Sequence, residues 1–99
     1  MAKNIYFIET YRMPVGCTSW ISPQRSWEME NEDEVYHRWQ AIVKEVKRDY
    51  PHARMARTLN RRSAEQAFRD RESSIASREW VLSPRDGKYR VTMYVAKAA

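Results

Sequence analysis

Cysteine, glycine and proline are scarce in this chain of 99 residues. Cys17 is the one cysteine, so no disulfide can form within the chain, and the reducing cytoplasm is the expected location. Two glycines and four prolines leave little room for flexible linkers or low-complexity segments. Because Gly16 and Gly87 stand alone, no glycine-rich loop is available to cradle a nucleotide phosphate, and such a site is disfavoured.

Long apolar runs are also missing. No stretch approaches the roughly 20 apolar residues that span a bilayer. The longest uncharged stretch, residues 13–24, is interrupted by Pro14, Gly16 and Pro23. The first residues lack the apolar core and the small-residue cleavage site of a secretory signal. We therefore expect a protein that does not enter the membrane.

Candidate catalytic and metal-binding groups are few. His37, His52 and Cys17 are scattered at spacings that match no zinc site, so we expect no metal and no other cofactor. No serine or cysteine has the flanking motif of an activated nucleophile. A small metal-dependent nuclease is the third hypothesis, and it would draw on several acids that no spacing singles out: Glu9, Glu28, Glu30, Glu79 and Asp86. Catalysis is therefore the minority hypothesis.

Hydrophobic and aromatic residues are plentiful enough to form a core. Hydrophobic residues make up 42% of the chain and aromatic residues 12%, including four tryptophans, which suffices for folding without disulfides or metals. A length of 99 residues is typical of one domain and leaves no room for a second core. We expect a single compact domain over residues 1–99.

Strand patterns occur near both ends of the chain. A continuous β-prone run from Ile5 to Ile8 predicts a first strand over residues 3–12, covered on both faces and therefore central. Residues 17–21, between Gly16 and Pro23, predict a short returning strand. Residues 80–95 alternate around a turn at 83–87 and predict a β-hairpin.

Two helices are predicted between these strands. Asn31 with Glu34 has capping-box spacing, and apolar residues recur at steps of three and four from Val35 to Tyr50. The acids around Asn31 suit the first turn of that helix. Ser63 with Gln66 repeats the capping spacing, and a thinner apolar stripe extends the second predicted helix through Ser74.

Residues 52–60 fit either a strand or a helix. The short turn before them favours a strand, which places Met55, Arg57 and Leu59 on one side. The element order then predicts an α+β fold, with a mainly antiparallel sheet of three to five strands, two helices packed on one face and a C-terminal β-hairpin. A winged-helix arrangement is a secondary alternative.

Charge gives the first functional hypothesis. Eighteen Lys and Arg against thirteen Asp and Glu leave a net charge of +5, and residues 47–62 hold six basic residues against one acid, Asp49. Guanidinium groups bind phosphate in bidentate fashion, so we expect contact with nucleic acid or a ribonucleoprotein through Lys47, Arg48, Arg54, Arg57, Arg61, Arg62, Arg69 and Arg71. The alternative is a solvated helix face on which Glu65, Asp70 and Glu72 pair with Arg69 or Arg61 at helical spacing.

Tryptophans give the second functional hypothesis. Trp39 and Trp80 fall in core positions of the predicted helix and hairpin, whereas Trp20 and Trp27 flank a proline-containing loop. Aromatic, Met and Arg side chains are enriched at protein interfaces, so Trp20, Arg25, Trp27 and Met29 predict a surface that binds another protein. The second hypothesis is therefore an inhibitor or adaptor that blocks a host protein, of the type found among the small accessory proteins of phages and mobile elements. A homodimer through the edge of residues 17–21 or 89–95 is a further alternative.

Overall fold

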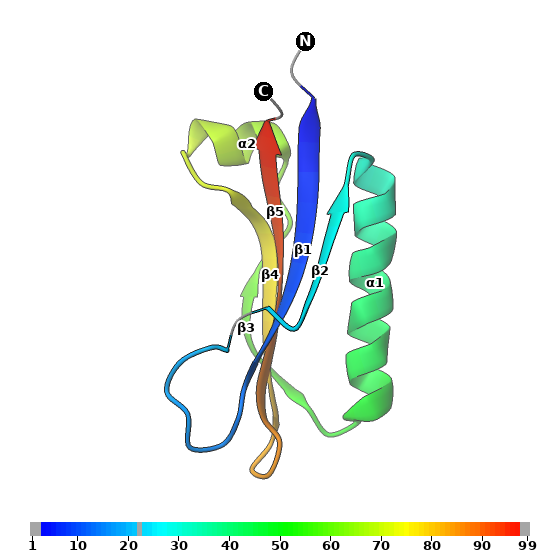
Figure 1. Cartoon of the computed structure of the whole chain (residues 1–99). Coiled ribbons are helices and arrows are strands. Elements are labelled where there is room, and N and C mark those ends of the chain that lie inside the picture. Colours follow the sequence, from blue (N-terminus) through cyan, green and yellow to red (C-terminus); the bar gives the residue numbers. More distant parts are fainter. Residues whose placement is uncertain (1–2, 22, 98–99) are drawn as a thin grey trace.

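The computed structural model describes residues 3–21 and 23–97 as a five-stranded antiparallel sheet with a long helix along one side (Figure 1). The elements are β1 (Asn4–Met13), β2 (Arg25–Met29), α1 (Glu32–Asp49), β3 (Arg54–Leu59), α2 (Ala64–Arg69), β4 (Ser74–Ser83) and β5 (Gly87–Lys97). Their order in the sheet is β2-β1-β5-β4-β3. The predicted α+β class and the C-terminal hairpin are confirmed. Neither helix in the described part of the chain has the length and apolarity needed to cross a membrane.

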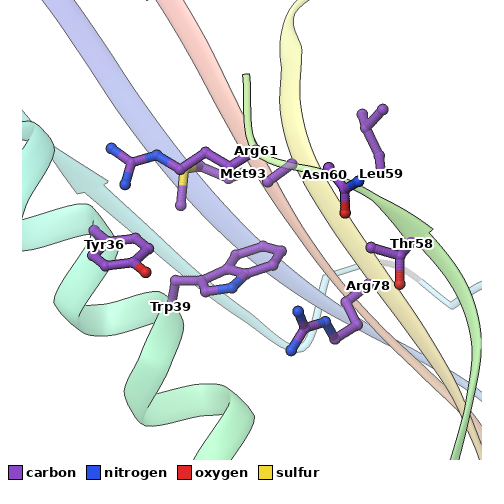
Figure 2. A pocket seen from close by; sticks show the side chains of 9 residues that line it. Tyr36, Trp39, Thr58, Leu59, Asn60, Arg61, Arg78 and Met93 are labelled. Atoms are coloured by element: carbon purple, nitrogen blue, oxygen red, sulfur yellow. The ribbon is translucent and has the colours of Figure 1, made fainter. Parts of the chain in front are cut away.

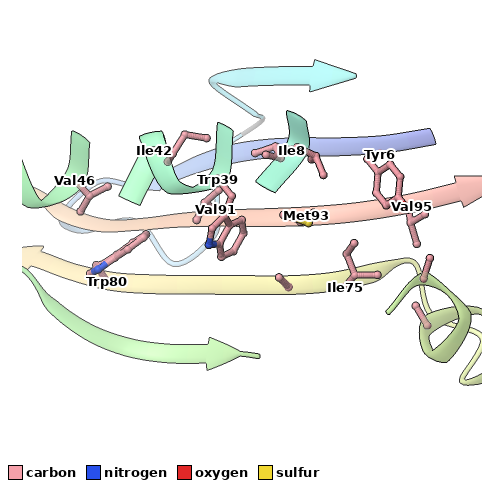
Figure 3. Packing of buried hydrophobic residues seen from close by; sticks show 14 of the residues in the cluster. Tyr6, Ile8, Trp39, Ile42, Val46, Ile75, Trp80, Val91, Met93 and Val95 are labelled. Atoms are coloured by element: carbon pink, nitrogen blue, oxygen red, sulfur yellow. The ribbon is translucent and has the colours of Figure 1, made fainter. Parts of the chain in front are cut away.

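The first strand lies inside the sheet, as predicted, but the expectation that both of its faces are covered is wrong, because only alternate residues of β1 are buried. β1 pairs antiparallel with β2 on one side and with β5 on the other. Its side chains alternate, so Tyr6 and Ile8 are buried on the side that α1 covers, opposite Val95 and Met93 of β5. Figure 3 shows these residues in the core beneath α1. We call this side of the sheet the helix face and the other side the open face.

Helix α1 begins and ends where the sequence indicates. The Asn31 side chain accepts a hydrogen bond from the Asp33 amide at 2.7 Å and thereby satisfies one of the free amides of the first turn. Acids fill the first turn, and Lys47 and Arg48 lie in the last turn, so both ends suit the helix dipole. The stripe that faces the sheet consists of Val35, Trp39, Ile42 and Val46, all buried.

The predicted strand over residues 17–21 is wrong. The chain turns at Gly16, whose φ is +88°, and the Cys17 amide donates to the Pro14 carbonyl at 3.1 Å. The strand that returns along β1 is instead β2, in a segment that the sequence pattern marks as loop. On this edge strand only Trp27 and Met29 pack against the core, so the five residues carry too little apolar alternation to mark a strand.

The second helix is shorter than predicted. Ser63 caps it, accepting from the Gln66 amide at 3.1 Å, but α2 ends at Arg69 rather than extending through Ser74. Ile75 and Ala76, which continue the apolar stripe in the sequence, belong to β4. Ala64 and Ala67 of α2 join the same core as the α1 stripe, so both helices contribute to the helix face.

Strand β3 resolves the ambiguity of residues 52–60 in favour of extended chain. The prediction that Met55, Arg57 and Leu59 share one side is nevertheless wrong, because a β-bulge lies between Met55 and Arg57. Met55 therefore lies opposite Trp80 on the helix face, and Arg57 lies opposite Glu79 on the open face. Every residue of β3 is exposed.

The expected dimerisation edges are not edges of the sheet. Strand β5 pairs with β1 on one side and with β4 on the other, and residues 17–21 form no strand. The edges are β2 and β3. Helix α1 packs mainly on β1, β2 and β5, which leaves the helix face of β3 and part of β4 without a helix directly above them. The space between α1 and the uncovered strands β3 and β4 is the candidate site.

Candidate nucleic-acid interface

A groove runs along α1 between this helix and the strands β4 and β3. Its inner part is a cavity of about 150 Å³ in which Thr58, Asn60 and Arg61 meet the helix. Its outer part, about 400 Å³, follows α1 past Gln40, Lys44 and Lys47. Tyr36, Trp39 and Arg78 line both parts, so the two form one continuous feature, which we call the groove.

Arg78 is the central side chain of the groove. It stands on β4 opposite Val91 and Thr58, and this register directs it to the helix face, where most neighbours are apolar. Figure 2 shows its side chain extending towards α1 beside the indole of Trp39. Its Nε is buried and has no hydrogen-bond partner within the described protein. A buried donor left unpaired costs about 1–3 kcal/mol. The Arg78 side chain also lines both parts of the groove, which places a guanidinium charge beside the space that a ligand would occupy.

In the part of the chain that the structure describes, acids neutralise only one of the cations that line the groove, Arg61. Lys44 and Lys47 are three residues apart on α1 and therefore share one side of the helix. Among the described residues, no Asp or Glu lines either part. Arg61, at the inner end, is ion-paired with Glu32 at 2.6 Å. Lys44, Lys47 and Arg78 thus give the groove a positive potential that a concave surface concentrates.

Aromatic rings stand next to these cations. Trp39 is 8% exposed and forms part of the floor, whereas Tyr36 is 37% exposed at the rim. The Arg61 guanidinium lies 4.5 Å from the centre of the Tyr36 ring, and this cation–π contact holds the ring in place. The groove therefore combines stacking surfaces with charge.

The structure brings only part of the predicted basic set together. Lys47 lines the outer part of the groove and Arg61 the inner part. Arg54 and Arg57 of β3 lie on the open face, opposite Val81 and Glu79. The eight residues therefore do not form one surface, because α1 and the bulged strand β3 direct them to different sides of the sheet.

The remaining predicted cations lie outside the groove. Arg48 is paired with Asp49 at 2.9 Å. Arg62 is held by Asp70 at 3.1 Å, by Glu72 and by the Ser74 carbonyl. Asp70 and Glu72 therefore do neutralise a cation, but it is Arg62 rather than the expected Arg69 or Arg61, and Arg61 pairs with Glu32 instead. Arg69 and Arg71 are exposed at the end of α2.

Sequence reasoning missed Arg78, Lys44, Tyr36, Trp39 and Asn60 as site residues. A usable signal did exist for Arg78, because it alternates with Ala76 and Trp80 and so takes an inward position on a strand. That signal requires β4 to begin near Ser74, in the segment where the sequence pattern predicts the end of a helix. An arginine on the apolar side of a strand would then have stood out.

The predicted protein-binding residues fall on two sides of the sheet. Arg25, Trp27 and Met29 share the helix face of β2, where Trp27 is half-buried and stacked by Arg25 at 4.5 Å. Arg25 also pairs with Glu45 at 2.7 Å, and this hydrogen bond lowers the pKa of the Glu45 carboxyl. These contacts connect Arg25 to α1 and Trp27 to Arg25, and Met29 packs against the core.

Trp20 lies apart from the other three, on the open face. There the Arg90 guanidinium lies 4.7 Å from the centre of the Trp20 ring and 4.8 Å from the centre of the Tyr11 ring. Burial, together with a hydrogen bond to Glu9, raises the pKa of the Tyr11 hydroxyl. The stack holds the loop that carries Trp20 against the sheet. The four residues therefore do not form one patch.

The acids considered for a nuclease are dispersed. Glu9, Glu28 and Glu79 occupy open-face positions on three different strands. Asp86 lies in the hairpin turn, where it accepts a hydrogen bond from the Ser83 hydroxyl at 2.9 Å. Within residues 3–21 and 23–97, no group of three or more His, Cys, Asp and Glu side chains is arranged to hold a metal ion.

Comparisons with known proteins give no match, whether with protein-family models, with curated proteins or with solved structures. Function therefore has to be inferred from the side chains of the groove.

Proposed function

We propose that the protein binds nucleic acid, free or within a ribonucleoprotein, through the groove between α1 and β4. The observation that carries this proposal is the lining of the outer part of the groove, where Arg78, Lys44 and Lys47 lie together and no described Asp or Glu accompanies them. A guanidinium group binds phosphate through two parallel hydrogen bonds, and lysines add charge along the backbone. A polyanion matches this arrangement better than a single small anion.

The aromatic side chains support the same partner. Sites for single strands combine a basic track with rings on which bases stack, and Tyr36 and Trp39 lie beside Arg78 in the groove. The net charge of +5 would also attract a polyanion over longer distances. A cytoplasmic location, where both DNA and RNA are accessible, belongs to the proposal.

The protein-binding hypothesis lacks comparable support. Trp20 is separated from Trp27 and Met29 by the sheet, and Arg25 is already paired with Glu45. A homodimer through the edge strand β3 is disfavoured. This strand carries the exposed residues Arg54 and Arg57, and charged edge strands resist pairing with a copy of themselves.

Salt dependence tests the proposal. Three phosphate contacts to a single strand give a slope of log affinity against log salt of about −2, so affinity should fall roughly 20-fold between about 50 and 200 mM salt. Fluorescence anisotropy with a labelled oligonucleotide measures this slope. No binding at about 50 mM salt, or binding that salt does not weaken, contradicts the proposal.

A further inference from the structure

The inner end of the groove differs from its outer part in size and in chemistry. We infer that this inner cavity takes one unpaired base, so that the protein selects single-stranded over double-stranded nucleic acid. The inference rests on the proposed function and names the form of nucleic acid that the same groove accepts. Three features of the cavity support it: its volume, its walls and the position of the lysines outside it.

The volume of the cavity suits one ring. It measures about 150 Å³, and a protein cavity of about that volume accommodates a benzene-sized molecule. A base pair is too large for such a space. A base that enters the cavity must therefore have left its stack and its partner, which costs least in a strand that is already single.

The walls of the cavity provide what a splayed base needs. Tyr36 and Trp39 project from α1, and Asn60 and Arg78 enter from the strand side, so that rings and polar groups converge (Figure 2). Aromatic rings stack on the faces of unpaired bases, and amide and hydroxyl groups bond to their edges. Asn60 and Thr58 are the neutral polar side chains in position to do so.

The lysines lie on the outer side of the same space. Lys44 and Lys47 line only the outer part, whereas Arg78 lines both parts. A strand with one base in the cavity would thus place its phosphates along the lysines, with Arg78 between base and backbone. In a duplex the bases stay stacked between two backbones, so it cannot offer a base to the cavity and phosphates to the lysines together.

Three labelled probes of equal length test the inference: an oligothymidine, the same backbone without bases, and a hairpin duplex. The oligothymidine should bind at least about tenfold tighter than the abasic strand, because one base stacked in the cavity contributes roughly that much affinity. The duplex should bind no tighter than the abasic strand. Anisotropy at low salt gives all three affinities.

Variants in the groove locate the base. Tyr36→Ala should bring the oligothymidine affinity close to that of the abasic strand and leave the abasic affinity unchanged. Lys44→Gln should weaken both single strands by the same factor, since it removes only charge. Thermal melting checks that each variant is folded, and Tyr36→Leu, which keeps an apolar side chain at the rim, replaces Tyr36→Ala if that protein unfolds.

The outcomes separate this inference from the proposed function. Equal, salt-sensitive affinities for the oligothymidine and the abasic strand, or a duplex that binds as tightly as the oligothymidine, overturn the base cavity and leave nucleic-acid binding standing. The same holds if the wild-type preference survives in the Tyr36 variant. Failure to bind any of the three probes overturns both.

Discussion

Gly87→Ala should lower the free energy of unfolding by about 2–4 kcal/mol, the sum of left-handed backbone strain and steric overlap. Gly87 has a φ of +81° at the start of β5. A Cβ at this position would collide with the Met13 carbonyl oxygen and lie 3.2 Å from the Pro14 carbonyl carbon. Because both neighbours are backbone atoms at or just after the end of β1, which is an interior strand, they cannot move aside without disturbing the sheet.

Thermal unfolding measures this effect. For a domain of this size the predicted loss corresponds to a decrease in Tm of more than about 10 °C. Gly16→Ala is the matched control, since Gly16 has a similar φ of +88° but no described atom lies within 4 Å of the place that a Cβ would take on this surface turn. It should lose only about 1 kcal/mol, from backbone strain alone. Equal losses in the two variants would show that the contact with Met13 is not the cause.

Arg62→Leu should lower the free energy of unfolding by about 2 kcal/mol, because it removes charge-assisted hydrogen bonds between the segment before α2 and the turn that follows α2. The Arg62 side chain is 18% exposed and donates to Asp70 at 3.1 Å and to the Ser74 carbonyl at 2.7 Å. These bonds fix the start of β4 against the turn after α2. Without Arg62, the Ser74 carbonyl loses this side-chain donor, and the Asp70 carboxylate keeps only the side-chain amide of Gln66 as a side-chain donor.

Chemical denaturation of Arg62→Leu and Arg61→Gln compares the free energies of unfolding of the two variants, and a binding measurement then shows whether Arg62 also contacts nucleic acid. Arg61 is adjacent in sequence, but its ion pair with Glu32 is more exposed, at 36% and 51%, so its loss should cost less than about 1 kcal/mol. Folded Arg62→Leu protein should also bind the oligonucleotide with the same salt slope as the wild type. A reduced slope would assign Arg62 to the nucleic-acid surface after all.

Local signals account for the parts of the fold that the sequence predicted. The Asn31 cap, the apolar stripe of α1 and the hairpin turn around Pro84 to Gly87 are each encoded within a few neighbouring residues. β2 was missed because its single packed side contributes only Trp27 and Met29. The boundary between α2 and β4 was missed because Ile75 and Ala76 suit either element.

The groove could not be predicted because it depends on contacts between distant segments. It exists only because α1 covers β2, β1 and β5 and stops short of β3. Arg78 joins Lys44 and Lys47 through the strand order, which no local pattern specifies. The bulge in β3 likewise places Met55 and Arg57 on opposite faces, which separates Arg57 from the lysines of α1. The number of basic residues along the chain therefore indicated a net positive charge but not which of these residues line the groove.

Two double variants with equal charge loss test the location of the site most directly. Lys44→Gln with Lys47→Gln removes two exposed cations from the groove, and Arg54→Gln with Arg57→Gln removes two from the open face. The groove variant should bind a single-stranded oligonucleotide roughly tenfold more weakly at low salt, with a salt slope smaller by about 1.4, and the open-face variant should match the wild type. Loss of affinity in the open-face variant with full binding by the groove variant would contradict the account.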